Sequence, residues 1–156
     1  ASPTAACGAA PRHWRGLLGC GDLPQALGMN ALSLLAVGGG AALGAWARWG
    51  LGIALNPLFP TLPLGTLAAN VVGGLLMGCA MGLIAHYESL APELRLFLTT
   101  GFLGGLTTFS TFSAESATLL LRGQWGWGAA HALLHGAGAL LAVLGGIGLM
   151  RLVLRA

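Results

Sequence analysis

The segment TTGFLGGLTTFSTFSAE, residues 99–115, decides how this chain is built. It combines three glycines, three phenylalanines and many threonine and serine hydroxyls, and it ends on the carboxylate of Glu115. Glycines and β-branched residues at this density weaken a continuous helix. Irregular backbone at membrane depth is tolerated only where it lines a cavity or is buried in protein. We therefore expect a broken membrane helix whose freed carbonyl and N–H groups can bind ions; the alternative is an intact helix with hydroxyls bonded to their own carbonyls.

The composition around this segment is that of an integral membrane protein. Of 156 residues, 56% are hydrophobic and only 7% are charged, and the mean hydropathy is +0.81. An average soluble domain has about 25% charged residues. The net charge of +3 comes from arginines spread along the chain, which form no basic stripe, so we expect no nucleic acid partner.

The few charged residues delimit the membrane spans. Uncharged runs of 25, 39, 19 and 28 residues separate Asp22 from Arg48, Arg48 from Glu88, Arg95 from Glu115, and Arg122 from Arg151. A span needs about 20 such residues, and prolines at 57, 60 and 63 divide the longest run into two helices. The sequence predicts an all-α membrane protein with four transmembrane helices per chain, the third of them broken. Their expected ranges are about 31–55, 64–86, 93–121 and 127–154.

Residues 1–28 differ from the rest of the chain. They show no helical or alternating period and no clear signal-peptide pattern, so we expect a poorly ordered extension before a channel domain over residues 29–156. Met29 is a candidate natural start. Cys7 and Cys20 have no metal-binding spacing, and a disulfide between them is possible but has no support; Cys79 is expected to pack as a small hydrophobe.

Glycine spacing and arginine placement bear on assembly. Gly74 and Gly78 form a GxxxG pair, which predicts close helix packing and favours an oligomer. From Met29 onward, three arginines fall on the N-terminal side of the membrane and two on the other. This near balance is compatible with insertion in both orientations.

The run GFLGGLTTFSTFSAE, residues 101–115, resembles the signature of the Fluc/CrcB family of fluoride channels. Further matches are GAWARW at 44–49, GTLAAN at 65–70 and the pair Arg122-Gly123, so the resemblance covers about residues 30–155. It implies a channel that passively exports toxic fluoride through a lipid bilayer, expected to be the bacterial inner membrane. It also implies an antiparallel, dual-topology homodimer with two pores and a structural sodium ion at its centre.

The resemblance assigns the pore residues by motif position. Phe109 and Phe112 would line the pore with their ring edges, Ser110 and Thr111 would supply hydroxyls, and Asn70 would donate its amide to the anion. Without the family, the phenylalanines read as core and Asn70 as a bond to a neighbouring helix.

Three further assignments follow from the same motif. The backbone carbonyls of Gly104 and Thr107 from both subunits would bind sodium. Arg48 would face the aqueous vestibule, although it also fits a side chain reaching for the membrane interface. Glu115 would join the polar track.

His131 and His135 depart from the family pattern, which places Tyr, Ser or Thr on this helix. Their i, i+4 spacing puts them on one face, but no third metal ligand is evident from the sequence. We expect them either to donate hydrogen bonds beside the pore or to lie nearer the membrane interface. If they line the pore, we hypothesise that their protonation makes conduction pH-sensitive.

Two other functions compete with a channel. A proton-coupled transporter of the small multidrug resistance type needs a carboxylate in its first helix, and residues 31–55 contain none. A non-transporting assembly subunit would leave the polar segment unexplained. No catalytic constellation is evident, so we do not expect an enzyme.

Overall fold

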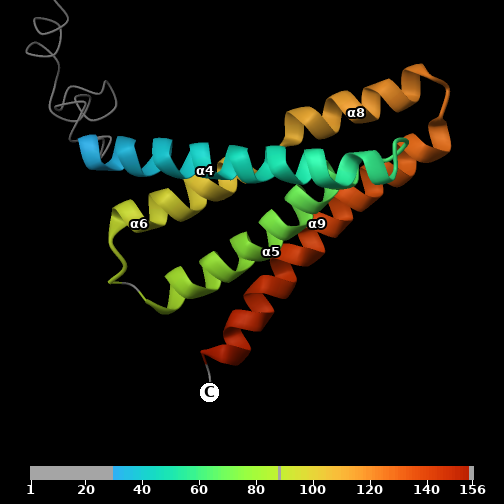
Figure 1. Cartoon of the computed structure of the whole chain (residues 1–156). Helices are drawn as coiled ribbons and strands as arrows, with labels where there is room; N and C mark the ends of the chain where they lie inside the picture. Colours follow the sequence, from blue (N-terminus) through green and yellow to red (C-terminus); the bar gives the residue numbers. More distant parts are fainter. Residues whose placement is uncertain (1–29, 88, 155–156) are drawn as a thin grey trace, which may run out of the picture. The chain divides into compact units, whose positions relative to one another are not determined.

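The computed structural model describes residues 30–87 and 89–154, and this part of the chain is helical, with no strand in it (Figure 1). The predicted extension over residues 1–28 and its two cysteines lie outside the described residues. The elements are α4 (Ala31–Leu55), the 3₁₀ turn η1 (Asn56–Leu58), α5 (Leu64–His86), α6 (Pro92–Leu96), the π-helical η2 (Phe97–Leu103), α7 (Gly104–Leu106), α8 (Phe109–Leu121) and α9 (Trp125–Val153).

The predicted helix limits are confirmed where prolines and glycines set them. Pro57 lies in η1 directly after α4, and Pro63 caps the start of α5. Asn56 ties this connection together, because its Oδ1 accepts the Gly65 N–H at 2.8 Å. After α8, Gly123 adopts a φ of +72°, the left-handed conformation that commonly ends a helix.

Three helices of the described chain are long and apolar enough to cross a membrane: Ala31–Leu58, Leu64–His86 and Trp125–Val153. The segment expected to be the third of four spans is not among them. It is divided into α6, η2, α7 and α8, and none of these pieces alone is as long as a bilayer is thick.

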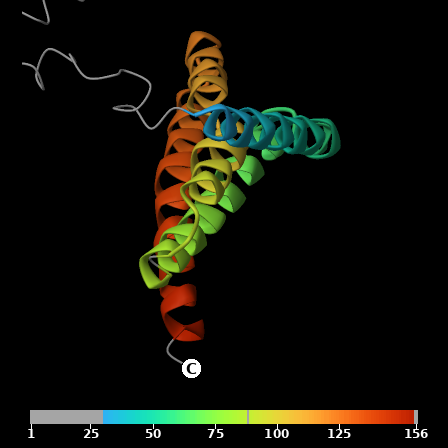
Figure 2. The same ribbon diagram turned by 90° about the vertical axis from the view of Figure 1, so that its left-hand side faces the viewer.

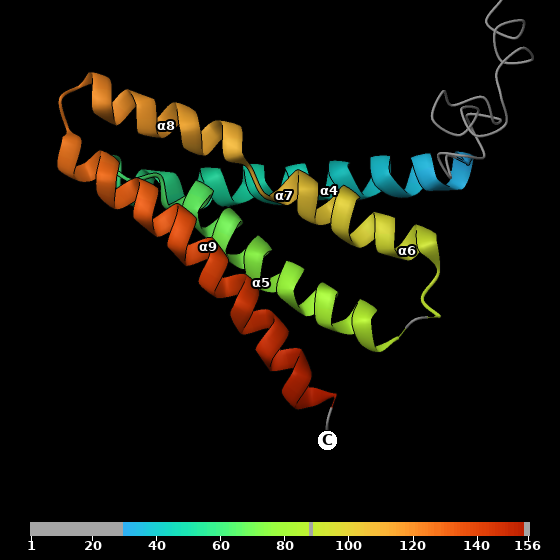
Figure 3. The same ribbon diagram turned by 180° about the vertical axis from the view of Figure 1, so that it is seen from behind.

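Helices α5 and α9 pack side by side along their lengths, and they stay adjacent in the turned views (Figures 2 and 3). Glycines permit this contact. A Cβ on Gly74 would lie 2.8 Å from the carbonyl oxygen of Ala139, and one on Gly78 would collide with the Val143 carbonyl. The GxxxG pair is thus confirmed as a site of close helix contact, here within one chain.

A second close contact joins α4, from residue 36 on, to η2 and α7. A Cβ on Gly40 would lie 2.8 Å from the Phe102 nitrogen, and one on Gly105 would lie 2.5 Å from the Ala41 carbonyl oxygen. Backbone meets backbone at this crossing, so the segment before the break is held firmly against α4.

The segment 97–103 is wider than an ordinary α-helix, a feature that the sequence did not predict. It forms a π-helix, in which each turn holds an extra residue. Gly101 lies in it, buried against α4, where a Cβ would come within 2.9 Å of the Val37 carbonyl oxygen. Such turns are often found at functional sites.

Candidate functional site

The predicted helix break is present at Thr107 and Thr108. Both residues have extended backbone, with φ and ψ of −81° and 155° at Thr107 and −151° and 118° at Thr108. Helix α8 restarts at Phe109 because Thr108 caps it: the Thr108 Oγ1 accepts the Thr111 N–H at 3.1 Å.

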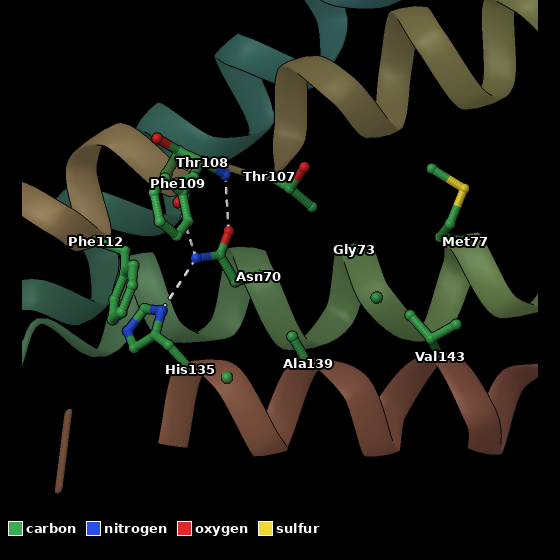
Figure 4. Close-up of a pocket in the computed structure, with 12 residues that line it drawn as sticks. Asn70, Gly73, Met77, Thr107, Thr108, Phe109, Phe112, His135, Ala139 and Val143 are labelled. Atoms are coloured by element: carbon green, nitrogen blue, oxygen red, sulfur yellow. Dashed lines mark hydrogen bonds between the residues drawn. The ribbon is translucent and has the colours of Figure 1, made fainter. Parts of the chain in front are cut away.

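Asn70 of α5 holds this break in place through both ends of its amide (Figure 4). Its Oδ1 accepts the Thr108 N–H at 2.7 Å, and its Nδ2 donates to the Thr108 carbonyl at 3.0 Å. The Nδ2 also lies 3.0 Å from Nδ1 of His135 on α9. Both amide hydrogens are therefore engaged, so Asn70 fixes the break in addition to lying beside the expected pore.

The break removes the usual helical donors of four carbonyl groups, those of residues 104–107, and two of them can be followed in detail. In a continuous helix the Thr108 N–H would bond the Gly104 carbonyl, and the Thr111 N–H would bond the Thr107 carbonyl. Here the first N–H is taken by Asn70 and the second by the Thr108 hydroxyl. Gly104 and Thr107, the two residues expected to hold sodium, are among the residues whose carbonyl oxygens lose their helical donors; the Gly105 carbonyl, another of them, accepts the Arg48 Nε–H.

The two phenylalanines of the segment lie together after the break. Their ring centroids are 5.5 Å apart, and Phe112 stacks on His135 at 4.9 Å and on His131 at 5.3 Å. Phe109 is 79% exposed in the single chain. Both phenylalanines, with Asn70 and His135, line a largely apolar cavity of 350 Å³ (Figure 4).

Glu115 joins α8 to the two neighbouring long helices. Its Oε1 accepts the hydroxyl of Thr66 on α5 at 2.7 Å, and its Oε2 lies 3.3 Å from Nε2 of His131 on α9. The other ring nitrogen of His131 is 2.9 Å from the Ser116 hydroxyl. The polar track expected from Glu115, His131 and His135 is therefore one connected cluster in this structure.

The remaining predicted residues lie around neighbouring cavities. The Arg48 Nε donates to the Gly105 carbonyl at 3.1 Å, and Arg48 and Thr111 share a cavity of 300 Å³. Thr111 also lines a 370 Å³ cavity with Glu115. Ser110 is exposed at the start of α8, with its hydroxyl 3.2 Å from that of Thr108.

Sequence reasoning missed Thr66, Thr108 and Ser116 as parts of the site. Thr66 and Ser116 enter only because α5, α8 and α9 pack together, which no local pattern reveals. Thr108 had a usable signal, since a threonine before an apolar helical run is a common N-cap.

The sequence pattern of the family described as CrcB-like protein, Camphor Resistance (CrcB), matches residues 35–147. The chain belongs to the CrcB family. A CrcB relative from Aromatoleum aromaticum, named fluoride-specific ion channel FluC, is 61% identical over 117 residues, which cover 75% of this chain and 89% of the relative. One of the same name from Nitrosospira multiformis is 60% identical over 119 residues, covering 76% and 93%. These relatives are named as ion channels and not as enzymes.

Proposed function

We propose that this protein is a fluoride-specific channel that lets fluoride leave the bacterial cytoplasm passively through the cell membrane. The observation that carries the proposal is the break at Thr107–Thr108, which gathers Phe109, Phe112 and a set of hydroxyl and amide groups beside cavities. The names of relatives at about 60% identity support the same conclusion.

The groups at the break suit a small, strongly hydrated anion. A pore must replace the hydrogen bonds of water with many weak donors while still letting the ion leave. Ring edges of Phe109 and Phe112 carry partial positive charge, and the hydroxyls of Ser110 and Thr111 can donate. Arg48 attracts anions from its own cavity, away from the phenylalanines, so no fixed cation traps the ion between the rings.

We further propose that two chains insert in opposite orientations and form an antiparallel dimer of four-span subunits. Phe109 is mostly exposed in the single chain, and the Gly104 backbone is exposed beside it, as expected if a second copy covers this face. The near balance of arginines on the two sides of the membrane supports dual orientation.

A sodium ion fits the centre of such a dimer. The carbonyl oxygens of Gly104 and Thr107, released by the break, are hard ligands of the kind that sodium prefers. The ion would hold the two breaks together and make the centre more favourable for an anion, without being transported itself.

A proton-coupled transporter of the small multidrug resistance type is not favoured. Its exchange chemistry needs a carboxylate in the first span, and α4 has none. The carboxylate of Glu115 lies on α8, not on α4, and is bonded to Thr66.

The proposal is tested by efflux from liposomes loaded with potassium fluoride and potassium chloride, with valinomycin added to dissipate the membrane potential. Ion-selective electrodes should record rapid release of fluoride and retention of chloride. Release of both anions, or of neither, would contradict the proposal.

Two sets of variants distinguish loss of the pore from general damage to the fold. Phe109→Ala combined with Phe112→Ala should abolish fluoride release, while Phe59→Ala, which removes a phenylalanine from the loop after η1, should keep it. Replacing sodium with N-methylglucamine during purification and assay should lower the flux if sodium supports the dimer. Equal flux in both cations would remove sodium from the proposal.

A further inference from the structure

Three side chains meet between α8 and α9 and form what we call the Glu115–histidine cluster: Glu115, His131 and His135. Each side chain offers one ligand atom, and the three ligand atoms lie within 4.8 Å of one another; the Glu115 Oε2 and the His131 Nε2 are 3.3 Å apart. His131 is fully buried and His135 is 4% exposed. The cluster therefore places one carboxylate oxygen and two imidazole nitrogens around one point.

Each of these three side chains has one buried polar atom that is left without a hydrogen bond. Among residues 30–87 and 89–154, the buried side-chain nitrogen and oxygen atoms that have no hydrogen-bond partner are the Glu115 Oε2 and the two histidine Nε2 atoms. His131 Nε2 lies 3.3 Å from the carboxylate without the geometry of a hydrogen bond. Buried polar atoms without a hydrogen-bond partner are rare and destabilising, so three of them in one cluster point to a ligand.

The opposite atoms of the same side chains are all held. Thr66 donates to the Glu115 Oε1, the Ser116 hydroxyl contacts Nδ1 of His131, and Asn70 contacts Nδ1 of His135. Metal-binding histidines and carboxylates are usually oriented by such outer hydrogen bonds. The bonds from Thr66 and Ser116 suit this role at Glu115 and His131, whereas at His135 the outer partner is the Asn70 amide, which donates to the ring.

We propose that the Glu115–histidine cluster binds a divalent transition-metal ion of the zinc class. One carboxylate and two imidazoles are a ligand set that zinc accepts. With bonds of about 2.0–2.1 Å, two donors on a tetrahedral ion lie about 3.3 Å apart, which is the separation of Glu115 Oε2 and His131 Nε2. The third donor, His135, must move closer to complete the set.

Binding at His135 is coupled to the helix break. The Asn70 amide is oriented by the backbone of Thr108, so its N–H group faces the Nδ1 of His135 and the proton of a neutral ring lies on Nε2. A metal ion at Nε2 must displace this proton and make Nδ1 a donor, which breaks the bond to Asn70. We therefore expect occupancy to loosen the contact that holds the break and to slow ion flow. Only this consequence rests on the proposed channel function.

A cavity of 370 Å³ lies beside the carboxylate of the cluster. Glu115 lines it together with the hydroxyl residues Thr111 and Thr118. Arg122 lines the same cavity, and its charge opposes the entry of a cation. The site should consequently bind a divalent cation less tightly than a site without this positive neighbour would.

The test uses Co²⁺ as a visible probe of the zinc site. The purified full-length chain, with any affinity tag removed and without fluoride, is titrated with Co²⁺ in detergent, and Zn²⁺ is then added. We expect one Co²⁺ per chain at saturation, the absorption bands of tetrahedral cobalt, and their loss on addition of Zn²⁺. The absence of fluoride makes the result independent of whether the protein is a channel.

Variants locate the bound ion. His131→Ala, His135→Ala and Glu115→Gln should each weaken binding at least about tenfold, since even outer partners of a metal site contribute 10–100-fold. The other two histidines of the chain serve as controls, and His13→Ala and His86→Ala should leave binding unchanged. Wild-type affinity in His131→Ala would overturn the proposal.

A measurement on the unaltered chain guards against misfolded variants. X-ray absorption at the zinc edge should show nitrogen and oxygen ligands at about 2.0–2.1 Å with imidazole scattering. A sulfur shell at about 2.3 Å would assign the ion to cysteines, and no bound zinc after dialysis at micromolar concentration would mean that the cluster is only an internal carboxylate–imidazole contact. Either result would overturn the proposal.

Discussion

Asn70→Ala offers a direct test of how the break is held. Asn70 makes two bonds to the Thr108 backbone, at 2.7 and 3.0 Å, and one contact with His135 at 3.0 Å. Thr108 is only 9% exposed, so water cannot readily replace the lost partners. At about 1 kcal/mol for each net hydrogen bond, the two lost bonds to the break amount to about 2 kcal/mol, or roughly a 30-fold shift toward local opening.

The exchange rate of the Thr108 amide hydrogen measures this opening. We expect the Thr108 amide, which is bonded to the Asn70 side chain, to exchange about 30-fold faster in Asn70→Ala, as measured by mass spectrometry of peptides spanning the break. Asn70→Asp keeps an oxygen that accepts this N–H but loses the group that donates to the Thr108 carbonyl, so by the same count the amide should exchange roughly fivefold faster than in the wild type. Asn56→Ala is the matched control: it removes one amide contact, to Gly65, and should leave Thr108 unchanged.

Unchanged exchange at Thr108 in Asn70→Ala, or an equal increase in Asn56→Ala, would contradict this expectation. Either result would mean that packing against α4, and not the Asn70 amide, fixes the extended residues.

Two further substitutions test the packing and the cap. Gly78→Ala should lower the free energy of unfolding by about 1–3 kcal/mol, because the added Cβ collides with the Val143 carbonyl. Gly148 has open space around it, so Gly148→Ala should change the free energy of unfolding by less than about 0.5 kcal/mol. Denaturant titration monitored by circular dichroism measures both values. Thr108→Ala should lower the free energy of unfolding by about 1 kcal/mol, because the cap on α8 is lost. Thr108→Ser keeps a hydroxyl at this position and should be nearly as stable as the wild type. Equal stability of the two variants would count against the cap.

The fold was largely predictable because prolines mark where the first two long helices end and begin. Pro57 and Pro63 cannot continue a helix, and α4 and α5 end and begin beside them as expected. The break was predictable from the glycines and threonines of residues 101–111, since these residue types favour extended backbone and caps over helix.

What the sequence did not reveal depends on contacts between helices. The π-helical turn at 97–103 forms where Gly101 meets the backbone of α4, a pairing that no local pattern encodes. The third ligand beside His131 and His135 was likewise missed. Glu115 lies 16 residues before His131 in the sequence and reaches it only because α8 folds back along α9.

The most direct test of the central claim is the reversal potential of purified protein in a planar bilayer, with a tenfold fluoride gradient and equal chloride on both sides. A fluoride-selective channel predicts a current that reverses near the fluoride equilibrium potential, about 59 mV from zero, and that does not move when a pH gradient is added. A reversal at zero, a shift with the pH gradient, or no current at all would contradict the account.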